Sequence, residues 1–251
     1  MDSLTDYNSK QTLYRRLVNA TKKNRFLYTV AKIVNPGRKI EINKIADGLD
    51  NRNDTVLDIG CGDGYWTNHF SKKSKKVVGI DPFETDLKVA RQYALPATEY
   101  VLGSGENLPF QDGSFNKVVS VCVFEHLKND VKAFKEIRRV LASKGSLLAT
   151  VDSLHSSYLS EEYREWHMKE CYCSQLYTTE SITEKLRLAG FTKVQAHYIM
   201  GTRLAIWWET MTEKFGAFVL LFSPVLYPLL MVIEGSPKKS GYKIFVKATK
   251  E

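Results

Sequence analysis

The 251-residue chain is poor in the features that mark several classes of protein. Its four cysteines are too few for a disulfide scaffold in a chain of this length, so a reduced, cytoplasmic setting is expected. The first residues contain no apolar h-region, and no secretory leader is predicted. No internal repeat or low-complexity segment is found. Hydrophobic residues make up 43% and charged residues 25%, which is typical of a globular protein.

The net charge of +8 is distributed unevenly along the chain. Residues 1–50 hold ten basic and five acidic residues, and residues 203–251 hold seven and four, so the segment between them has no net charge. An enzyme of nucleic acids usually carries its basic surface around its site. No nucleic-acid partner is therefore expected.

Short apolar runs alternate with amphipathic segments in the middle of the chain. The apolar runs are expected to form strands at 55–59, 77–80, 117–123, 146–151, 191–199 and 242–249. The amphipathic segments are expected to form helices at 65–71, 87–94, 130–141 and 179–189, the last capped by Thr179 or Ser181. This order predicts an α/β fold with a doubly wound, mostly parallel sheet that helices cover on both faces.

The beginning of the chain predicts a separate helical region. Apolar positions separated by basic residues favour a helix over 9–34, which Asn35-Pro36-Gly37 is expected to end. We therefore expect an N-terminal helical extension over residues 1–50 and a main domain over residues 51–251.

Three glycines at alternate positions follow the strand expected at 55–59. Glycine permits a positive φ and lets a ligand approach the backbone closely, so Gly60, Gly62 and Gly64 favour a binding loop. The dinucleotide-binding pattern is Gly-x-Gly-x-x-Gly. Here the third glycine comes one residue early, and Tyr65 stands where that pattern has glycine. A nicotinamide oxidoreductase is therefore the weaker interpretation.

Four ordered segments resemble the class I S-adenosylmethionine-dependent methyltransferases, in their small-molecule and ubiquinone-type branch. Asp58-x-Gly60-x-Gly62-x-Gly64 resembles their first motif, and residues 77–81 resemble their second strand, which ends in an acid. Residues 103–115 resemble the adenine-side loop, although many relatives have Asp-Ala where this chain has Ser104-Gly105. Residues 121–127 resemble the Glu-His segment after strand four. The resemblance implies a seven-stranded Rossmann-like sheet and S-adenosyl-L-methionine as cofactor.

The resemblance also implies which residues bind the cofactor. The glycine loop, shaped by Asp58, would hold the methionine end, the carboxylate of Asp81 would accept hydrogen bonds from the ribose hydroxyls, and Gly105 and Glu106 would flank the adenine. The full set of expected cofactor-binding residues is Asp58, Gly60, Cys61, Gly62, Gly64, Asp81, Pro82, Ser104, Gly105, Glu106 and Cys122.

Two histidines are the candidates for catalysis. His126 is the leading candidate for a general base, because its pKa near ~6.5 suits proton transfer at neutral pH, and His155 follows the fifth strand where acceptor contacts often lie. Each can equally be a packing residue. No metal is expected: Cys122 replaces the first Glu of the metal-binding Glu-x-x-Glu-His form, and His167, Cys171 and Cys173 match zinc spacing poorly.

The acceptor is expected to be a small or lipid-linked molecule that is methylated at oxygen. Methyltransferases of nucleic-acid or protein amides carry Asn/Asp-Pro-Pro-aromatic after strand four, whereas this chain has Val121-Cys122-Val123-Phe124 there. A catalytically silent protein that binds the cofactor for a partner is the alternative from another class.

An apolar insertion occupies residues 203–234, before the last strand. Residues 216–233 carry no charge, but 18 residues cannot cross a bilayer twice, and Pro224 and Pro228 would bend the run. One interpretation is peripheral contact with anionic lipid on the inner face of the cell membrane, with Trp207 and Trp208 at headgroup level. The other is a substrate lid or dimer interface in a soluble enzyme; the oligomeric state stays open.

Overall fold

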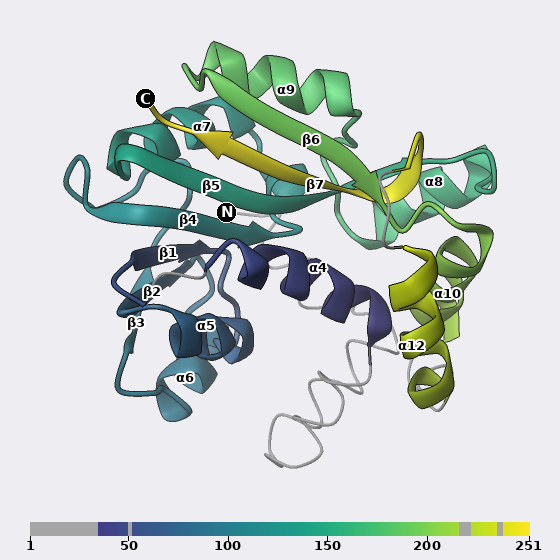
Figure 1. Cartoon of the computed structure of the whole chain (residues 1–251), viewed down its shortest axis with the longest axis horizontal. Helices are drawn as coiled ribbons and strands as arrows, with labels where there is room; N and C mark the ends of the chain where they lie inside the picture. The colour runs from purple at the N-terminus through teal and green to yellow at the C-terminus, as the bar shows by residue number, and fades with distance from the viewer. Residues whose placement is uncertain (1–34, 50–51, 216–221, 235–237) are drawn as a thin grey trace. The chain divides into compact units, whose positions relative to one another are not determined.

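The computed structural model describes residues 35–49, 52–215, 222–234 and 238–251. These residues form one seven-stranded sheet with the strand order β3-β2-β1-β4-β5-β7-β6 (Figure 1). The strands are β1 (Thr55–Ile59), β2 (Lys76–Asp81), β3 (Thr98–Leu102), β4 (Phe115–Val121), β5 (Leu141–His155), β6 (Lys193–Ile199) and β7 (Gly241–Thr249). The neighbouring pairs from β3 to β5 are parallel, which confirms the predicted doubly wound fold.

Helices flank this sheet and connect its strands. They are α4 (Pro36–Asp47), α5 (Tyr65–Phe70), α6 (Glu84–Gln92), α7 (Asp130–Val140), α8 (Glu161–Glu170), α9 (Thr179–Leu188), α10 (Arg203–Phe215) and α12 (Ser223–Ile233), with 3₁₀ helices η1 (Ser71–Lys73) and η2 (Phe124–His126). Each predicted helix and strand within the described residues is present, with ends shifted by a few residues.

One helix was not predicted, and one prediction about a helix cap is wrong. Pro36 begins α4, because the first position of a helix needs no N–H donor and proline has none. Thr178, and not Thr179 or Ser181, caps α9: its hydroxyl accepts from the Ser181 N–H in a capping box. The helix predicted over 9–34 lies outside the described residues.

The core beside β1 explains why α4 forms. Ile42, Ile45 and Ala46 of α4 belong to one buried cluster with residues of β1, β2, β4 and β5, among them Val56 and Val119. An amphipathic helix is stabilised chiefly by such burial of its apolar face. This part of α4 is therefore part of the sheet's core.

The chain forms two compact units, which are treated separately below. The sheet unit comprises residues 41–153, 174–197 and 243–251. Of the described residues, the insertion unit comprises 35–40, 154–173 and those within 198–242. The glycine loop belongs to the sheet unit, and the apolar insertion belongs to the insertion unit.

Candidate active site

The glycine loop lies at the carboxyl end of β1, where parallel α/β sheets bind ligands. Gly60, Gly62 and Gly64 all have positive φ, at 72°, 51° and 75°. A Cβ at Gly60 would lie 2.3 Å from the Val123 side chain, and one at Gly64 would lie 2.6 Å from the Tyr100 hydroxyl. A Cβ at Gly62 would have no neighbour within 4 Å. The backbone at Gly62 is therefore open to a ligand, whereas the two outer glycines are required by the packing of the protein itself.

Asp81 ties this loop to the end of β2. Its Oδ2 accepts from the Gly62 N–H at 2.8 Å, and its Oδ1 accepts from the Phe83 N–H at 2.9 Å. Burial raises the pKa of this carboxyl to about 6, against the lowering effect of the two backbone hydrogen bonds. Each oxygen keeps a further lone pair, so the carboxylate can still accept from ribose hydroxyls.

The side chain of Asp58 connects β1 to α5, next to the glycine loop. Its Oδ2 accepts from the Thr67 hydroxyl at 2.6 Å, and both residues are buried. Burial raises the pKa of Asp58 to about 7, the hydrogen bond from Thr67 lowers it, and the charge of Asp81 raises it further. Asp58 therefore connects β1 to α5, and its role in shaping a cofactor loop stays a prediction.

Tyr100 supports the loop and was not predicted. Its hydroxyl lies 3.2 Å from the Gly64 carbonyl oxygen and 3.1 Å from Asn68 Oδ1. The ring also packs against Cys61. The thiol of Cys61 is buried against Gly79, so only the backbone of Cys61 is available to a ligand. Tyr100 stands in β3, a strand of five residues without alternating polarity, so the sequence carries no strong signal for it.

The expected adenine-side residues form a turn beside β1. Ser104 Oγ accepts from the Glu106 N–H at 3.2 Å, and Gly105 packs against Ile59. Glu106 Oε1 accepts from the Asn129 N–H at 2.9 Å, which ties this turn to the start of α7. Pro82, directly after Asp81, is exposed. Contact of these residues with adenine and ribose stays a prediction.

A buried ionic cluster lies where β4 and β5 end, and sequence analysis did not find it. Lys243 Nζ is 2.7 Å from Asp152 Oδ1, 3.1 Å from Cys122 Sγ and 3.8 Å from Glu41 Oε1. Glu41 Oε2 accepts from the Thr150 hydroxyl at 2.7 Å and from the Cys122 thiol at 2.9 Å. Cys122 has a positive φ of 52°. The thiol of Cys122 is engaged by Lys243 and Glu41 within the protein, and its contact with the cofactor stays a prediction.

Glu125 borders the same cluster. Its side chain is fully buried, its Oε1 accepts from the Asp152 N–H at 3.3 Å, and its Oε2 has no hydrogen-bond partner among the described residues. Burial, followed by the charge of Asp152, raises the pKa of Glu125 to about 8. Cys122, Glu125 and Asp152 lie close enough to share a cation, but the ammonium of Lys243 already supplies the positive charge there. We therefore assign this set to an ion-pair network.

The two candidate catalytic histidines fall in different units. His126 is half-buried at the end of η2 in the sheet unit, and its N–H donates to the Val123 carbonyl at 3.0 Å. His155 is exposed in the insertion unit and stacks on the Tyr198 ring at 5.5 Å. Their catalytic roles stay predictions.

The residues considered for zinc belong to a different network. His167 Nδ1 lies 2.8 Å from Glu213 Oε2 and 3.3 Å from the Tyr242 hydroxyl, and the Tyr163 hydroxyl donates to the same Glu213 oxygen at 2.8 Å. Cys171 Sγ is 3.8 Å from His167 Nδ1. This buried tyrosine–histidine–glutamate network joins α8, α10 and β7 and gives His167 a structural role.

Comparisons with known proteins agree with this geometry. Residues 57–149, from β1 into β5, match the methyltransferase-domain family. The biotin-biosynthesis bifunctional protein BioHC of Cellvibrio japonicus is 31% identical over 117 residues, which are 47% of this chain and 23% of that protein. The chain covers less than two thirds of the length of the first curated relatives that it matches.

Solved structures share the fold. Phosphoethanolamine N-methyltransferase 2 of Haemonchus contortus, solved with S-adenosyl-L-methionine, is 19% identical with a TM-score of 0.65, covering 95% of this chain and 60% of that one. The [4+2]-cyclase SpnF is 17% identical with a TM-score of 0.59, covering 85% and 81%. The ubiquinone-type branch thus stays a prediction, whereas residues 57–149 match the methyltransferase-domain family and the seven-stranded sheet has the fold of these solved structures.

Proposed function

We propose that the protein transfers a methyl group from S-adenosyl-L-methionine to a hydroxyl oxygen of a small or lipid-linked acceptor. One observation carries the cofactor assignment: Gly62 is the loop glycine whose missing Cβ leaves open space, and its N–H is bonded to Asp81. The open backbone and a carboxylate with remaining lone pairs lie side by side, which fits the methionine end and the ribose of this cofactor.

The residues of the chain would act mainly by positioning. S-adenosylmethionine, when bound, supplies a methyl group on a sulfonium, which a nucleophile can attack in line. Asp81 and the backbone at Gly62 and Gly105 would fix the cofactor, and the carboxyl ends of β4 and β5 would receive the acceptor. A hydroxyl acceptor must lose its proton, and His126 is the proposed base.

The proposed acceptor class rests on the segment after the fourth strand, on the apolar insertion and on the basic ends of the chain. Val121-Cys122-Val123-Phe124 follows the fourth strand, without the prolines of amide methyltransferases. The apolar insertion and the basic ends of the chain favour an acceptor that is reached at a membrane surface. A soluble enzyme that uses the insertion as a lid, and a silent cofactor-binding protein, are the alternatives; the cyclase among the structural neighbours illustrates that this fold does not fix the reaction.

Methyl-labelled cofactor tests this proposal directly. The purified protein is incubated with it and with lipid and aqueous extracts of the source cells, and a His126→Ala variant serves as the comparison. We expect label in the lipid fraction, in a product that is stable to the conditions that hydrolyse esters and amides. Label only in the aqueous fraction would favour the soluble enzyme. Cofactor binding without label in either fraction would contradict the enzymatic proposal.

A further inference from the structure

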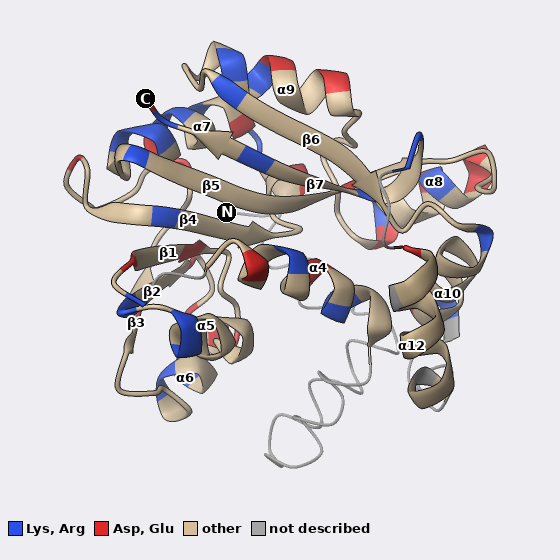
Figure 2. Cartoon of the chain, in the orientation of Figure 1, with Lys and Arg blue, Asp and Glu red and all other residues tan. Residues whose placement is uncertain are grey.

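The exposed face of α12 consists of apolar side chains. Phe222, Val225, Leu229 and Val232 are exposed, Val225 to 77% and Val232 to 80%. Their spacing of three and four residues places them along one side of the helix. The helix has no charged residue along its whole length, and neither blue nor red falls on it in Figure 2. The insertion unit therefore exposes a continuous apolar stripe, which we call the α12 stripe.

The α12 stripe is fixed to the rest of the insertion unit. Directly after α12, the buried carboxylate of Glu234 accepts from the Gly201 N–H at 3.1 Å and from the Thr202 N–H at 2.9 Å, at the start of α10. Lys238 Nζ donates to the Ile233 carbonyl at 2.8 Å, at the carboxyl end of α12. A surface held in place in this way loses little conformational freedom when it binds a partner.

The charges of the insertion around the α12 stripe differ in their exposure. Within residues 198–242, Glu209 and Glu234 are buried, and Glu213 is bonded to Tyr163 and His167. Arg203, Lys214 and Lys239 of the same segment are exposed. Helix α8 carries the other acidic residues of the unit, and in Figure 1 it lies on the far side of α10 from α12. The exposed charged side chains within the described part of residues 198–242 are therefore basic.

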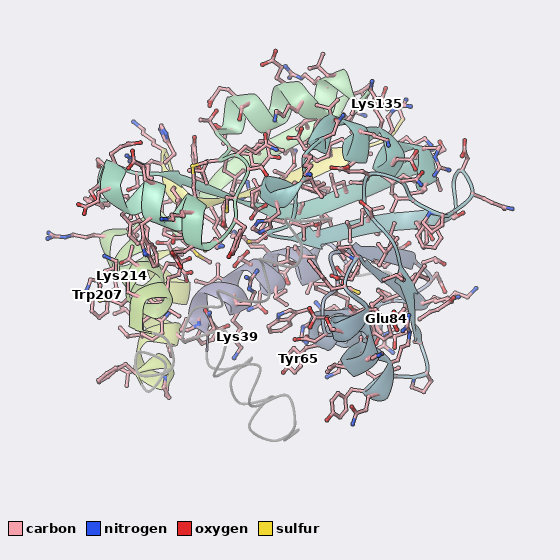
Figure 3. The ribbon with its side chains drawn as sticks, turned by 180° about the vertical axis from the view of Figure 1, so that it is seen from behind. Lys39, Tyr65, Glu84, Lys135, Trp207 and Lys214 are labelled. Atoms are coloured by element: carbon pink, nitrogen blue, oxygen red, sulfur yellow. The ribbon has the colours of Figure 1, made fainter. Side chains whose placement is uncertain are left out.

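Two residues of the unit are suited to a membrane interface. Trp207, 48% exposed, and Lys214 both project from α10 in Figure 3, whereas Trp208 is buried, so its expected place at headgroup level is wrong. Lys39 Nζ lies 4.4 Å from the centre of the Tyr227 ring, on the side of α12 opposite the stripe. Tryptophan and basic side chains that flank an apolar helix face are typical of helices that lie in the headgroup region.

We propose that the α12 stripe docks into the surface of an anionic lipid bilayer. Anionic headgroups complement the exposed basic side chains of residues 198–242, and the acyl boundary beneath them accommodates the uncharged face of α12. No helix within the described ranges has the length and apolarity to cross a bilayer. With 11 residues, α12 is roughly 16 Å long, about half of the hydrocarbon thickness, so it lies along the interface. This inference deepens the proposed function, because a bilayer would supply a lipid-linked acceptor. It rests on the proposed function for that point alone.

Vesicle flotation of the full chain tests this proposal. Phosphatidylcholine vesicles with and without phosphatidylserine are compared for the wild type, for Val225→Ser with Leu229→Ser and Val232→Ser, and for a control, Leu102→Ser with Leu188→Ser. The control removes two exposed apolar side chains, at 52% and 65%, from β3 and α9. We expect the wild type and the control to float with phosphatidylserine vesicles, less so at high salt, and the stripe variant to bind at least roughly tenfold more weakly.

Two further measurements keep the outcomes distinct. Cofactor affinity should be equal in all three proteins, so that a loss of flotation is separated from a loss of the proposed methyltransferase site. Sedimentation velocity reports self-association. A wild type that does not float, or a stripe variant that floats as well as the control, would overturn the proposal. A dimer that the stripe variant abolishes, without flotation, would assign the stripe to a second copy of the chain instead.

Discussion

The glycine loop and the ionic cluster lie in the same sheet unit, but their residues are arranged differently along the chain. The loop is built by consecutive residues whose backbone conformations are fixed locally, at Gly60, Gly62 and Gly64. The cluster joins Glu41, Cys122, Asp152 and Lys243, which are up to about two hundred positions apart. Backbone geometry therefore determines the first region, and long-range side-chain pairing determines the second.

Removal of the central cation should have the largest effect on stability. Lys243→Met leaves the buried carboxylates of Asp152 and Glu41 without their counter-ion, and we expect a loss of about 3–5 kcal/mol in the free energy of unfolding. Lys247→Met on the same strand, where the side chain is exposed, should change it by less than about 0.5 kcal/mol. Urea denaturation of both variants measures the difference. Equal losses would show that the cluster is not an interacting network.

The loss of stability caused by one added methyl group should depend on which glycine of the loop receives it. Gly60→Ala places a Cβ against Val123 in a left-handed conformation, and we expect a loss of about 2–4 kcal/mol. Gly62→Ala adds the same backbone strain without a clash, and about 1–2 kcal/mol should be lost. Thermal unfolding followed by circular dichroism compares the two. A larger loss at Gly62 would contradict the packing described for this loop.

The pH dependence of stability should separate Glu125 from the rest of the cluster. Because its pKa is raised from 4.5 to about 8 in the folded protein, the protonated form is favoured by folding. Its contribution to stability is therefore complete below about pH 4.5 and is lost as the pH rises toward 8. Glu125→Gln should match the wild type near pH 5 and exceed it by about 1–3 kcal/mol near pH 8.5. Parallel curves for the two proteins across this range would show that Glu125 ionises normally.

Features fixed by neighbouring residues could be predicted from the sequence, whereas features that depend on long-range pairing could not. The fold and the strand that carries Asp58 into the glycine loop could be predicted, because apolar periodicity and glycine spacing are local signals. The strand β3 was missed because Thr98–Leu102 is only five residues long and does not alternate polar and apolar side chains, and Tyr100 was missed with it. The helix α4 was not predicted, because Pro36 was interpreted only as the end of the segment before it, whereas proline also marks the beginnings of helices.

The ionic cluster and the α12 stripe show what local patterns leave out. No spacing rule brings Lys243 to Asp152, since only the pairing of strands in the finished sheet places them together. The apolar character of residues 216–233 could be read directly, but which side of α12 is exposed depends on the packing of the insertion unit.

Cofactor titration with a matched pair of glycine variants tests the central claim most directly. Gly62 and Gly113 both have positive φ, at 51° and 70°, and both have room for a Cβ, but Gly62 is an expected cofactor-binding residue, whereas Gly113 stands at the other end of the 103–115 segment from the expected contacts at Ser104, Gly105 and Glu106. Isothermal titration with S-adenosyl-L-methionine should give binding to the wild type and to Gly113→Ala, and binding at least roughly tenfold weaker to Gly62→Ala. Equal affinity of the two variants, or no binding to the wild type, would contradict the assignment of this loop to the cofactor.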